Sequence, residues 1–228
     1  HTDEFSGLNS EKLDIFLSGS YSEDLGWDRK PSTKGIEKNK DITTNFEITA
    51  NGFRKSCNKF SHSKIATFGD SYAFCRYVND DETWQHYLEH KINTHVRNFG
   101  VGNYGIDQAF LKFDKTQLDN ENEFVMFAVV PETISRVHSY WKHYLEFGNI
   151  LSFKPRFLLN KNNEVIKINN YLSKYKTVSS IRNNIEEIKL NDFFYKIKFL
   201  KRMFKFPYSI SFLRYPKLNI QIFGYLFA

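Results

Sequence analysis

The sequence predicts an α/β protein with a parallel sheet, because three short apolar runs alternate with two amphipathic stretches in its first half. The apolar runs are typical of strands, and the stretches between them are typical of helices. The runs are residues 64–69, 96–99 and 124–130, and the amphipathic stretches are residues 82–96 and 106–118. Strands that alternate with helices pair in parallel through right-handed crossovers. We therefore expect an α/β core over residues 64–150.

Each of these elements has its own pattern. Residues 82–96 predict a helix with Asp81 or Thr83 near its cap; its expected buried stripe is Trp84, Leu88, Ile92 and Val96. Residues 106–118 predict a second helix, with Ile106, Ala109, Phe110 and Phe113 buried. Residues 124–130 are apolar without interruption, so we expect a strand that is covered on both faces.

The rest of the chain is expected to surround this core. Residues 1–63 are polar and predict an irregular arm packed on the domain, with contacts at Gly26-Trp27 and at residues 51–54. Residues 151–178 predict a hairpin excursion about the turn at residues 160–163. Residues 179–228 predict a helical tail of the same domain, helical over 179–206, with Ile181, Ile185, Ile188 and Phe193 as buried candidates.

Composition limits the class of protein. With 228 residues and 41% hydrophobic residues, the chain is long enough to bury a core of its own. Two cysteines cannot make a disulfide framework, so we expect free thiols. There is no apolar run of about 18 residues for a membrane helix, and the acidic start lacks a signal-peptide pattern. We expect a soluble chain.

The net charge of +6 is concentrated near the C-terminus. Residues 189–228 hold eight Lys and Arg against one acid, Asp192, and aromatic residues are interleaved with them. This segment predicts a helix that packs its aromatic side chains on the domain and leaves its lysines in water. A polyanion, such as an acidic glycan, or a membrane surface are the alternative partners. Nucleic acid could stack on the aromatic rings, but it is not the expected partner.

The most informative segment is residues 65–72, where an apolar run stops abruptly at Gly69-Asp70-Ser71. We call residues 69–71 the serine turn. A sharp turn at the end of a buried strand holds a hydroxyl clear of the sheet edge, where it can act as a nucleophile. The serine turn therefore indicates a hydrolase site.

A second turn follows the next predicted strand. Residues 100–105, which we call the glycine turn, match the G-x-G-x-x-G pattern between a strand and a helix. Such glycines can bring backbone N–H groups onto a pyrophosphate, with Glu132 as the partner acid. However, this pattern follows the second strand rather than the first. A structural tight turn is another alternative, and we favour a turn that binds an oxyanion beside Ser71.

Together these segments resemble the SGNH/GDSL hydrolases, and the flanks resemble one bacterial branch of that superfamily. The resemblance covers most of residues 20–170; it rests on Gly69-Asp70-Ser71, residues 98–105, Gly26-Trp27, Asn51-Gly52-Phe53-Arg54, residues 81–84 and residues 154–157. It implies a three-layer α/β/α sandwich with a flavodoxin-like parallel sheet. It also implies a serine esterase or acyltransferase that acts on O-acyl esters, of a small molecule or a bacterial polysaccharide, with no cofactor.

The resemblance also implies roles for single residues. Ser71 would be the nucleophile, and its N–H and the Gly102 N–H would be oxyanion donors, while Asp70 would brace the turn. The family's third donor is an asparagine, and Thr133 stands in its place here. One donor to a developing oxyanion contributes about 3–4 kcal/mol to lowering the barrier.

The activating base is missing from this pattern. The Asp-x-x-His pair of the family lies near the C-terminus, and no histidine follows His143. His138 and His143 are the candidate substitutes, with an aromatic surface helix as the alternative. His86 and His90 are spaced like zinc ligands, but we expect a solvated helix face there and no metal. We therefore expect this chain to be inactive or incomplete as an enzyme, and the alternative function is a non-catalytic binding module.

Overall fold

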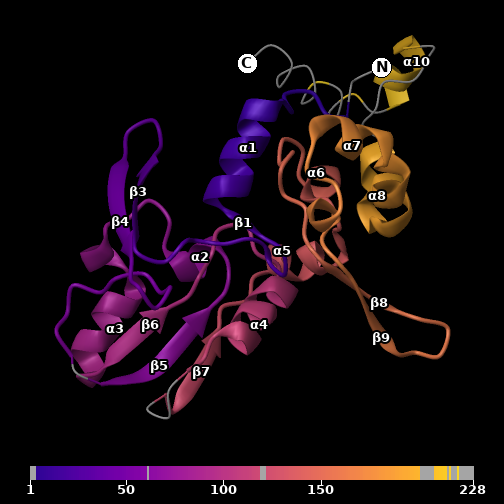
Figure 1. Cartoon of the computed structure of the whole chain (residues 1–228). Coiled ribbons are helices and arrows are strands. Elements are labelled where there is room, and N and C mark those ends of the chain that lie inside the picture. The colour runs from indigo at the N-terminus through magenta and orange to yellow at the C-terminus, as the bar shows by residue number, and fades with distance from the viewer. Residues whose placement is uncertain are drawn as a thin grey trace. The chain divides into compact units, whose positions relative to one another are not determined.

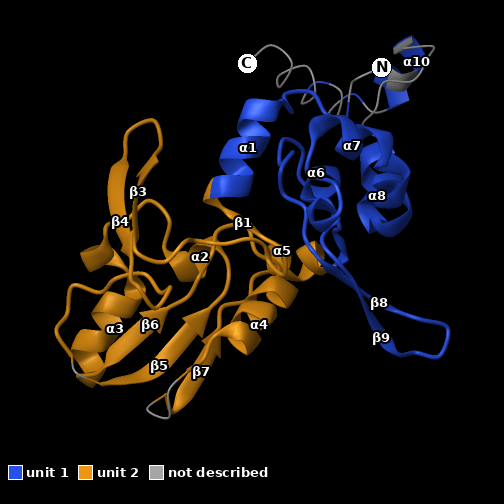
Figure 2. Ribbon diagram, in the orientation of Figure 1, with its two compact units in different colours: residues 1–18, 138–228 blue, residues 19–137 orange. Residues whose placement is uncertain are grey.

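The structure is a computed structural model that describes residues 4–60, 62–118, 122–200, 208–214, 216 and 220 (Figure 1). The chain forms two compact units, which Figure 2 shows in different colours. Residues 19–137 form one, which we call the sheet unit. Residues 1–18 and 138–228 form the other, which we call the aromatic unit. All three candidate site residues lie in the sheet unit.

A three-stranded parallel sheet forms the centre of the sheet unit. Its strands are β5 (Ser63–Phe68), β6 (His95–Asn98) and β7 (Phe124–Phe127), in the order β6-β5-β7. Thr67 of β5 is in register with Asn98 on one side and with Met126 on the other. The predicted α/β class and parallel pairing are therefore confirmed.

Helices pack against both faces of this sheet. They are α3 (Trp84–Ile92) and α4 (Ile106–Lys115). Gln85 of α3 donates to the Thr67 hydroxyl at 3.2 Å, whereas Ala109 of α4 belongs to a buried cluster with Ala66 and Phe68. Because alternate side chains of a strand point to opposite faces, α3 and α4 cover opposite sides of β5.

The segment before the sheet is more regular than predicted. It contains α1 (Ser10–Gly19), the pair β1 (Tyr21–Ser22) and β2 (Gly26–Trp27), and an antiparallel hairpin of β3 (Thr33–Lys38) and β4 (Thr43–Ile48). The expected irregular arm is therefore wrong for this stretch. The missed pattern is the alternation in β4, where Thr44, Phe46 and Ile48 are buried and their neighbours are more exposed.

The predicted buried stripe of the first helix is also wrong. Trp84 and Ile92 are 37% and 40% exposed, and Val96 lies in β6 rather than in the helix. The fully buried side chains of α3 are polar instead, namely Gln85 and Glu89. These two side chains hydrogen-bond loop and strand groups, which explains how a polar helix face is buried.

The strand at 124–130 differs from its prediction as well. Phe124, Val125 and Met126 of β7 are 60%, 38% and 43% exposed. The strand order places β7 at one edge, and among the described residues no strand pairs with its outer side. In α4, Phe110 is 56% exposed, although Ala109 is buried as predicted. The unbroken apolar run thus indicated that a strand forms here, but not how much of the strand is exposed.

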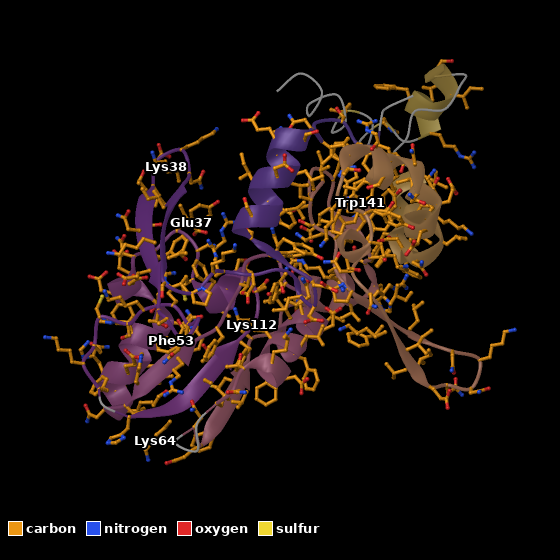
Figure 3. The ribbon with its side chains drawn as sticks, viewed as in Figure 1. Glu37, Lys38, Phe53, Lys64, Lys112 and Trp141 are labelled. Atoms are coloured by element: carbon orange, nitrogen blue, oxygen red, sulfur yellow. The ribbon has the colours of Figure 1, made fainter. Side chains whose placement is uncertain are left out.

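The aromatic unit is built around large rings. Its elements are α6 (Lys142–Leu145), β8 (Arg156–Leu159), β9 (Val165–Ile168), α7 (Val178–Asn183), α8 (Ile185–Asn191), a π-helical turn (Tyr195–Phe199) and α10 (Tyr208–Arg214), with a short 3₁₀ turn at Tyr171–Ser173. Another 3₁₀ turn, Arg136–His138, spans the boundary between the two units in the sequence. Trp141, labelled in Figure 3, stacks on Phe5 and on Phe153, each at 5.0 Å between ring centroids. The strands β8 and β9 form the predicted hairpin.

The predicted tail helix is interrupted. Ile181 and Ile188 are buried as expected, whereas Phe193 is 48% exposed. Phe199 packs on Tyr144 at 4.6 Å, so the start of the tail packs on its own unit. Residues 201–207, with part of the predicted helix, lie outside the described residues. Among the helices that the structure describes, none is long and apolar enough to cross a bilayer.

Candidate active site

The serine turn leaves the C-terminal end of β5 and leads directly into the one-turn helix α2 (Ser71–Phe74). Asp70 is buried and caps this helix, because its Oδ1 accepts a hydrogen bond from Tyr72 N at 2.9 Å. A capping carboxylate satisfies an N–H group that the helix leaves open. Ser71 itself is half-buried at the first position of α2.

A glycine is required at position 69 because neighbouring atoms approach its backbone closely. A Cβ built at this position would lie 2.9 Å from both Ala128 O and Ala73 Cβ. Real Cβ contacts are not this short, so any larger residue would push β5 away from α2 or from the end of β7. The glycine therefore lets strand and helix pack tightly at the serine turn.

The glycine turn leaves the neighbouring strand β6 at the same edge of the sheet. Phe99 N donates to Thr67 O at 2.8 Å, and Val101 N donates to Gly69 O at 3.0 Å, so the two turns are hydrogen-bonded to each other. Among the described residues, the Gly102 N–H has no protein acceptor and the Ser71 hydroxyl has no hydrogen-bond partner. An N–H and a hydroxyl at one sheet edge, both without protein partners, are groups that a ligand can use.

The glycine turn is held by the segment around β2. Trp27 Nε1 donates to Gly102 O at 3.0 Å, and the Tyr104 hydroxyl donates to Trp27 O at 2.6 Å. Tyr104 is fully buried, and burial raises the pKa of its hydroxyl well above the usual value. Two reciprocal bonds thus fix the backbone on both sides of Asn103, which has a left-handed φ of 71°. Preorganised N–H groups need such a rigid support.

A buried ion pair links the two turns. Arg136 Nη1 lies 3.1 Å from Asp70 Oδ2 and donates to Tyr104 O at 3.1 Å. Both side chains are largely buried, so removing one partner would leave an uncompensated charge in the interior. Arg136 was not among the predicted site residues, since a single arginine after the third strand has no distinctive spacing. Asp70 braces the turn, as predicted.

Thr133, the candidate third donor, has a different role in the structure. It lies in α5 (Pro131–Ser135), directly after β7, and is 1% exposed. Its hydroxyl donates to Val130 O at 2.7 Å and accepts from Val130 N at 3.2 Å. The Thr133 proton therefore closes the first turn of its own helix, and the structure does not bring it to Ser71 as a donor.

None of the described histidines of the sheet unit is hydrogen-bonded to the Ser71 hydroxyl. His95 begins β6, at the N-terminal edge of the sheet, and its Nδ1 contacts the buried Glu89. His86 and His90 make an edge-to-face contact with each other on α3, at 4.8 Å between ring centroids. Because β5 and β6 are parallel, the edge that holds His95 is the opposite end of the sheet from Ser71.

The two histidines proposed as substitute bases lie in the aromatic unit. His143 is 2% exposed and stacks on Trp141 at 4.7 Å, and its Nδ1 accepts a hydrogen bond from Gly148 N. Burial lowers the pKa of His143 to about 4. His143 is therefore a neutral core residue, enclosed by rings rather than open to a substrate. The His138 ring contacts Phe193 at 5.4 Å.

Positive charge gathers beside the glycine turn. A Cβ built on Gly102 would have Arg76 Cδ as its neighbour, at 3.7 Å. Arg76 Nε and Arg29 Nη2 both lie 3.1 Å from Oε1 of Glu37, the buried carboxylate labelled in Figure 3. One carboxylate is thus shared by two guanidinium groups. The Arg76 side chain is 37% exposed, so this edge of the sheet favours an anionic group.

One cavity of the sheet unit is separate from the serine turn. It has a volume of about 590 Å³, and its lining includes Arg29, Phe53, Arg97 and Lys112 but not Ser71 or Gly102. Within the described part of the chain, no group of three His, Cys, Asp or Glu side chains could hold a metal ion.

Neither a scan against protein-family models nor a search of curated proteins finds a match to this chain.

Proposed function

We propose that the sheet unit is a serine esterase or acyltransferase domain of SGNH/GDSL type, with the three-layer sandwich that this family implies. The substrate is an O-acyl ester of a small molecule or a bacterial polysaccharide. The Ser71 hydroxyl attacks the carbonyl carbon of the ester and forms an acyl-enzyme. The alcohol part of the substrate leaves in this step. Water or a second hydroxyl then takes up the acyl group.

One observation supports this proposal most strongly: the Ser71 hydroxyl and the Gly102 N–H lie on two hydrogen-bonded turns at one sheet edge, each without a protein partner among the described residues. Ester attack creates negative charge on the carbonyl oxygen, and a fixed N–H beside the nucleophile stabilises that charge. Trp27 and Arg136 hold this geometry through the glycine turn.

The test is hydrolysis of a short chromogenic acetyl ester by the full chain. We expect weak turnover that Ser71→Ala abolishes, because the oxyanion donors remain whereas no side chain among the described residues hydrogen-bonds the Ser71 hydroxyl as a base. Ser135→Ala is the matched control, since Ser135 is an exposed serine of the same unit. Equal turnover by wild type and Ser71→Ala would overturn the proposal.

A specific observation favours a second candidate function, a non-catalytic binding module. The cavity of about 590 Å³ is lined by four basic side chains, one acid, Asp28, and the rings of Phe53 and Phe99; the bases are Arg29, Arg97, Lys112 and Lys115. Three of these bases are ion-paired with protein carboxylates, Arg29 with Glu37, Lys112 with Asp28 and Lys115 with Asp24, so a ligand carboxylate would take the place of one of these partners. Such a lining suits an anionic ring compound, for example a uronic acid sugar. Calorimetric titration with an oligouronate distinguishes the candidates: salt-sensitive binding that Lys115→Gln weakens, without esterase activity, supports the module.

A further inference from the structure

The helix that carries Ser71 is too short to support itself. It comprises one turn, Ser71–Phe74, and it ends at Cys75, whose φ of 62° is left-handed. The last carbonyl groups of a helix have no partners within it, and a single turn is not stable on its own. The position of Ser71 therefore depends on whatever binds the C-terminal end of α2.

Side chains of α3 bind two of these carbonyl groups. Gln85 Nε2 donates to Ala73 O at 2.8 Å, and Trp84 Nε1 donates to Tyr72 O at 3.3 Å. Gln85 is 2% exposed, and its Oε1 accepts from Cys75 Sγ at 3.2 Å. Gln85 thus uses both ends of its amide on α2 and the residue that follows it.

Arg54 binds the carbonyl groups that follow. Its Nη1 donates to Phe74 O at 2.7 Å and to Cys75 O at 2.8 Å, and its Nη2 donates to Val78 O at 2.7 Å. Its Nε donates to Asp80 at 2.7 Å, and the residue is 3% exposed. The planar guanidinium satisfies several acceptors at once in a fixed geometry, which a lysine cannot do.

The backbone of Arg54 reaches the other turn. Arg54 N donates to Asn98 O at 2.8 Å, at the end of β6 and directly before the glycine turn. The Asn98 Oδ1 in turn accepts from Gly100 N at 2.9 Å. One residue is therefore bound to the strand that carries the glycine turn and to the helix that carries Ser71.

We propose that Arg54 and Gln85 are positioning residues that fix Ser71 relative to the Gly102 N–H. The expected effect on catalysis rests on the proposed function. That Arg54 and Gln85 hold the two turns in position rests on the hydrogen bonds alone. Both side chains are buried and hydrogen-bonded to protein groups, so they act through the turns that they hold. Their effect is on the alignment of nucleophile and oxyanion donor, where a displacement of about 1 Å can reduce the rate on the order of a hundredfold.

The test compares Arg54→Lys and Gln85→Met with Glu89→Gln. Glu89 is a buried polar residue of the same helix as Gln85, but its hydrogen-bond partners, Ser56, Asn58, His95 and Val96 N, belong neither to α2 nor to the glycine turn. Two quantities are measured well below the melting temperature: the rate of Ser71 modification by a fluorophosphonate, and amide hydrogen exchange in residues 69–78 and 99–105. We expect both positioning variants to slow modification about tenfold or more and to speed exchange in both segments.

Glu89→Gln should leave the modification rate and both exchange rates at wild-type values, although it lowers the melting temperature. If Gln85→Met and Arg54→Lys also leave them unchanged, the positioning role is overturned. If Arg54→Lys does not fold, Gln85→Met decides. If wild-type Ser71 does not react at all, the proposed function fails, and the exchange measurements alone decide whether these residues position the turn.

Discussion

The two units of this protein bury different kinds of side chain. In the sheet unit, buried charged and amide side chains such as Arg54, Gln85 and Glu89 bind backbone groups of the loops around the sheet. In the aromatic unit, the largest buried side chains are mainly rings, and Trp141 stacks on Phe5 and on Phe153. The first kind of interior fixes loops at defined positions, and the second mainly removes apolar surface from water.

The aromatic unit has a buried polar centre too, but it differs in kind. Asp192 accepts hydrogen bonds from the backbone N–H groups of Tyr140 and Trp141, at 2.7 and 2.9 Å. Burial is the main cause that raises the pKa of Asp192 above its usual range. This carboxylate holds a loop of its own core, whereas the polar residues of the sheet unit hold turns with groups left open for a ligand. This contrast is one reason why we propose the active site in residues 19–137.

The largest expected effect is the loss of a core ring. Trp141→Ala should destabilise the aromatic unit by about 3–5 kcal/mol, because it removes fully buried apolar surface and leaves a cavity. Chemical denaturation monitored by amide exchange in residues 138–200 measures the loss. Ile166→Ala on β9, which is 43% exposed, is the control and should change little. A small effect of Trp141→Ala would show that ring packing does not dominate this unit.

The second prediction concerns acid. His143 is neutral in the folded chain, with a pKa of about 4 against the usual 6.5, so between these values the unfolded chain binds the additional proton. The stability should therefore fall as pH decreases from 6.5 towards 4, by up to about 3 kcal/mol. His143→Phe should remove this dependence and keep the ring stack. If the two proteins lose stability in parallel, His143 does not titrate as a buried base.

A pair of glycine variants sharpens the comparison within the glycine turn. A Cβ at Gly100 would lie 2.3 Å from Phe74 N, in the backbone of α2, whereas a Cβ at Gly102 meets Arg76 Cδ at an ordinary 3.7 Å. Gly100→Ala should therefore cost about 1–3 kcal/mol, and Gly102→Ala about 0.5 kcal/mol or less. Melting temperatures of the two variants decide. Equal losses would contradict the tight contact between this turn and α2.

The smallest expected effect is the acid dependence of Glu89. Burial raises the pKa of this carboxyl, but hydrogen bonds from His95, Ser56, Val96 N and Asn58 outweigh it and lower the pKa below 4.5. The lowered pKa contributes stability above pH 4.5 that is lost as pH falls through the folded value. Glu89→Gln should show a flatter stability profile below that pH. A profile as steep as that of the wild type would contradict the assignment.

The parts of the fold that depend on short local sequence patterns were predictable from the sequence. The strands at 64–69, 96–99 and 124–130 were recognisable from apolar runs, and the serine and glycine turns from their glycines. Burial was not predictable in the same way, because the exposure of β7 depends on strand order, which no local pattern encodes. The polar face of α3 was missed because Gln85 and Glu89 are buried by distant hydrogen-bond partners.

The candidate site was predictable to the same extent. Ser71 and Gly102 follow neighbouring strands, and the structure brings their turns together. Arg54, Trp27 and Arg136 hold those turns, and their partners lie up to 77 residues away from them in the chain. Their roles arise from side-chain to backbone contacts across the fold, so spacing alone could not identify them. Thr133 shows the converse, since its position matched a pattern while its hydroxyl closes its own helix.

The most direct test is the reaction of the full chain with a fluorophosphonate, followed by mass spectrometry of the peptide that contains Ser71. We expect a slow, single modification at Ser71 that is absent in Ser71→Ala. The Ser71 hydroxyl can react because it has no hydrogen-bond partner among the described residues. The reaction should be slow because no described side chain of the sheet unit hydrogen-bonds this hydroxyl as a base. Absence of modification at Ser71, while other serines react, would contradict the nucleophile assignment. Rapid stoichiometric modification would contradict the absence of a base.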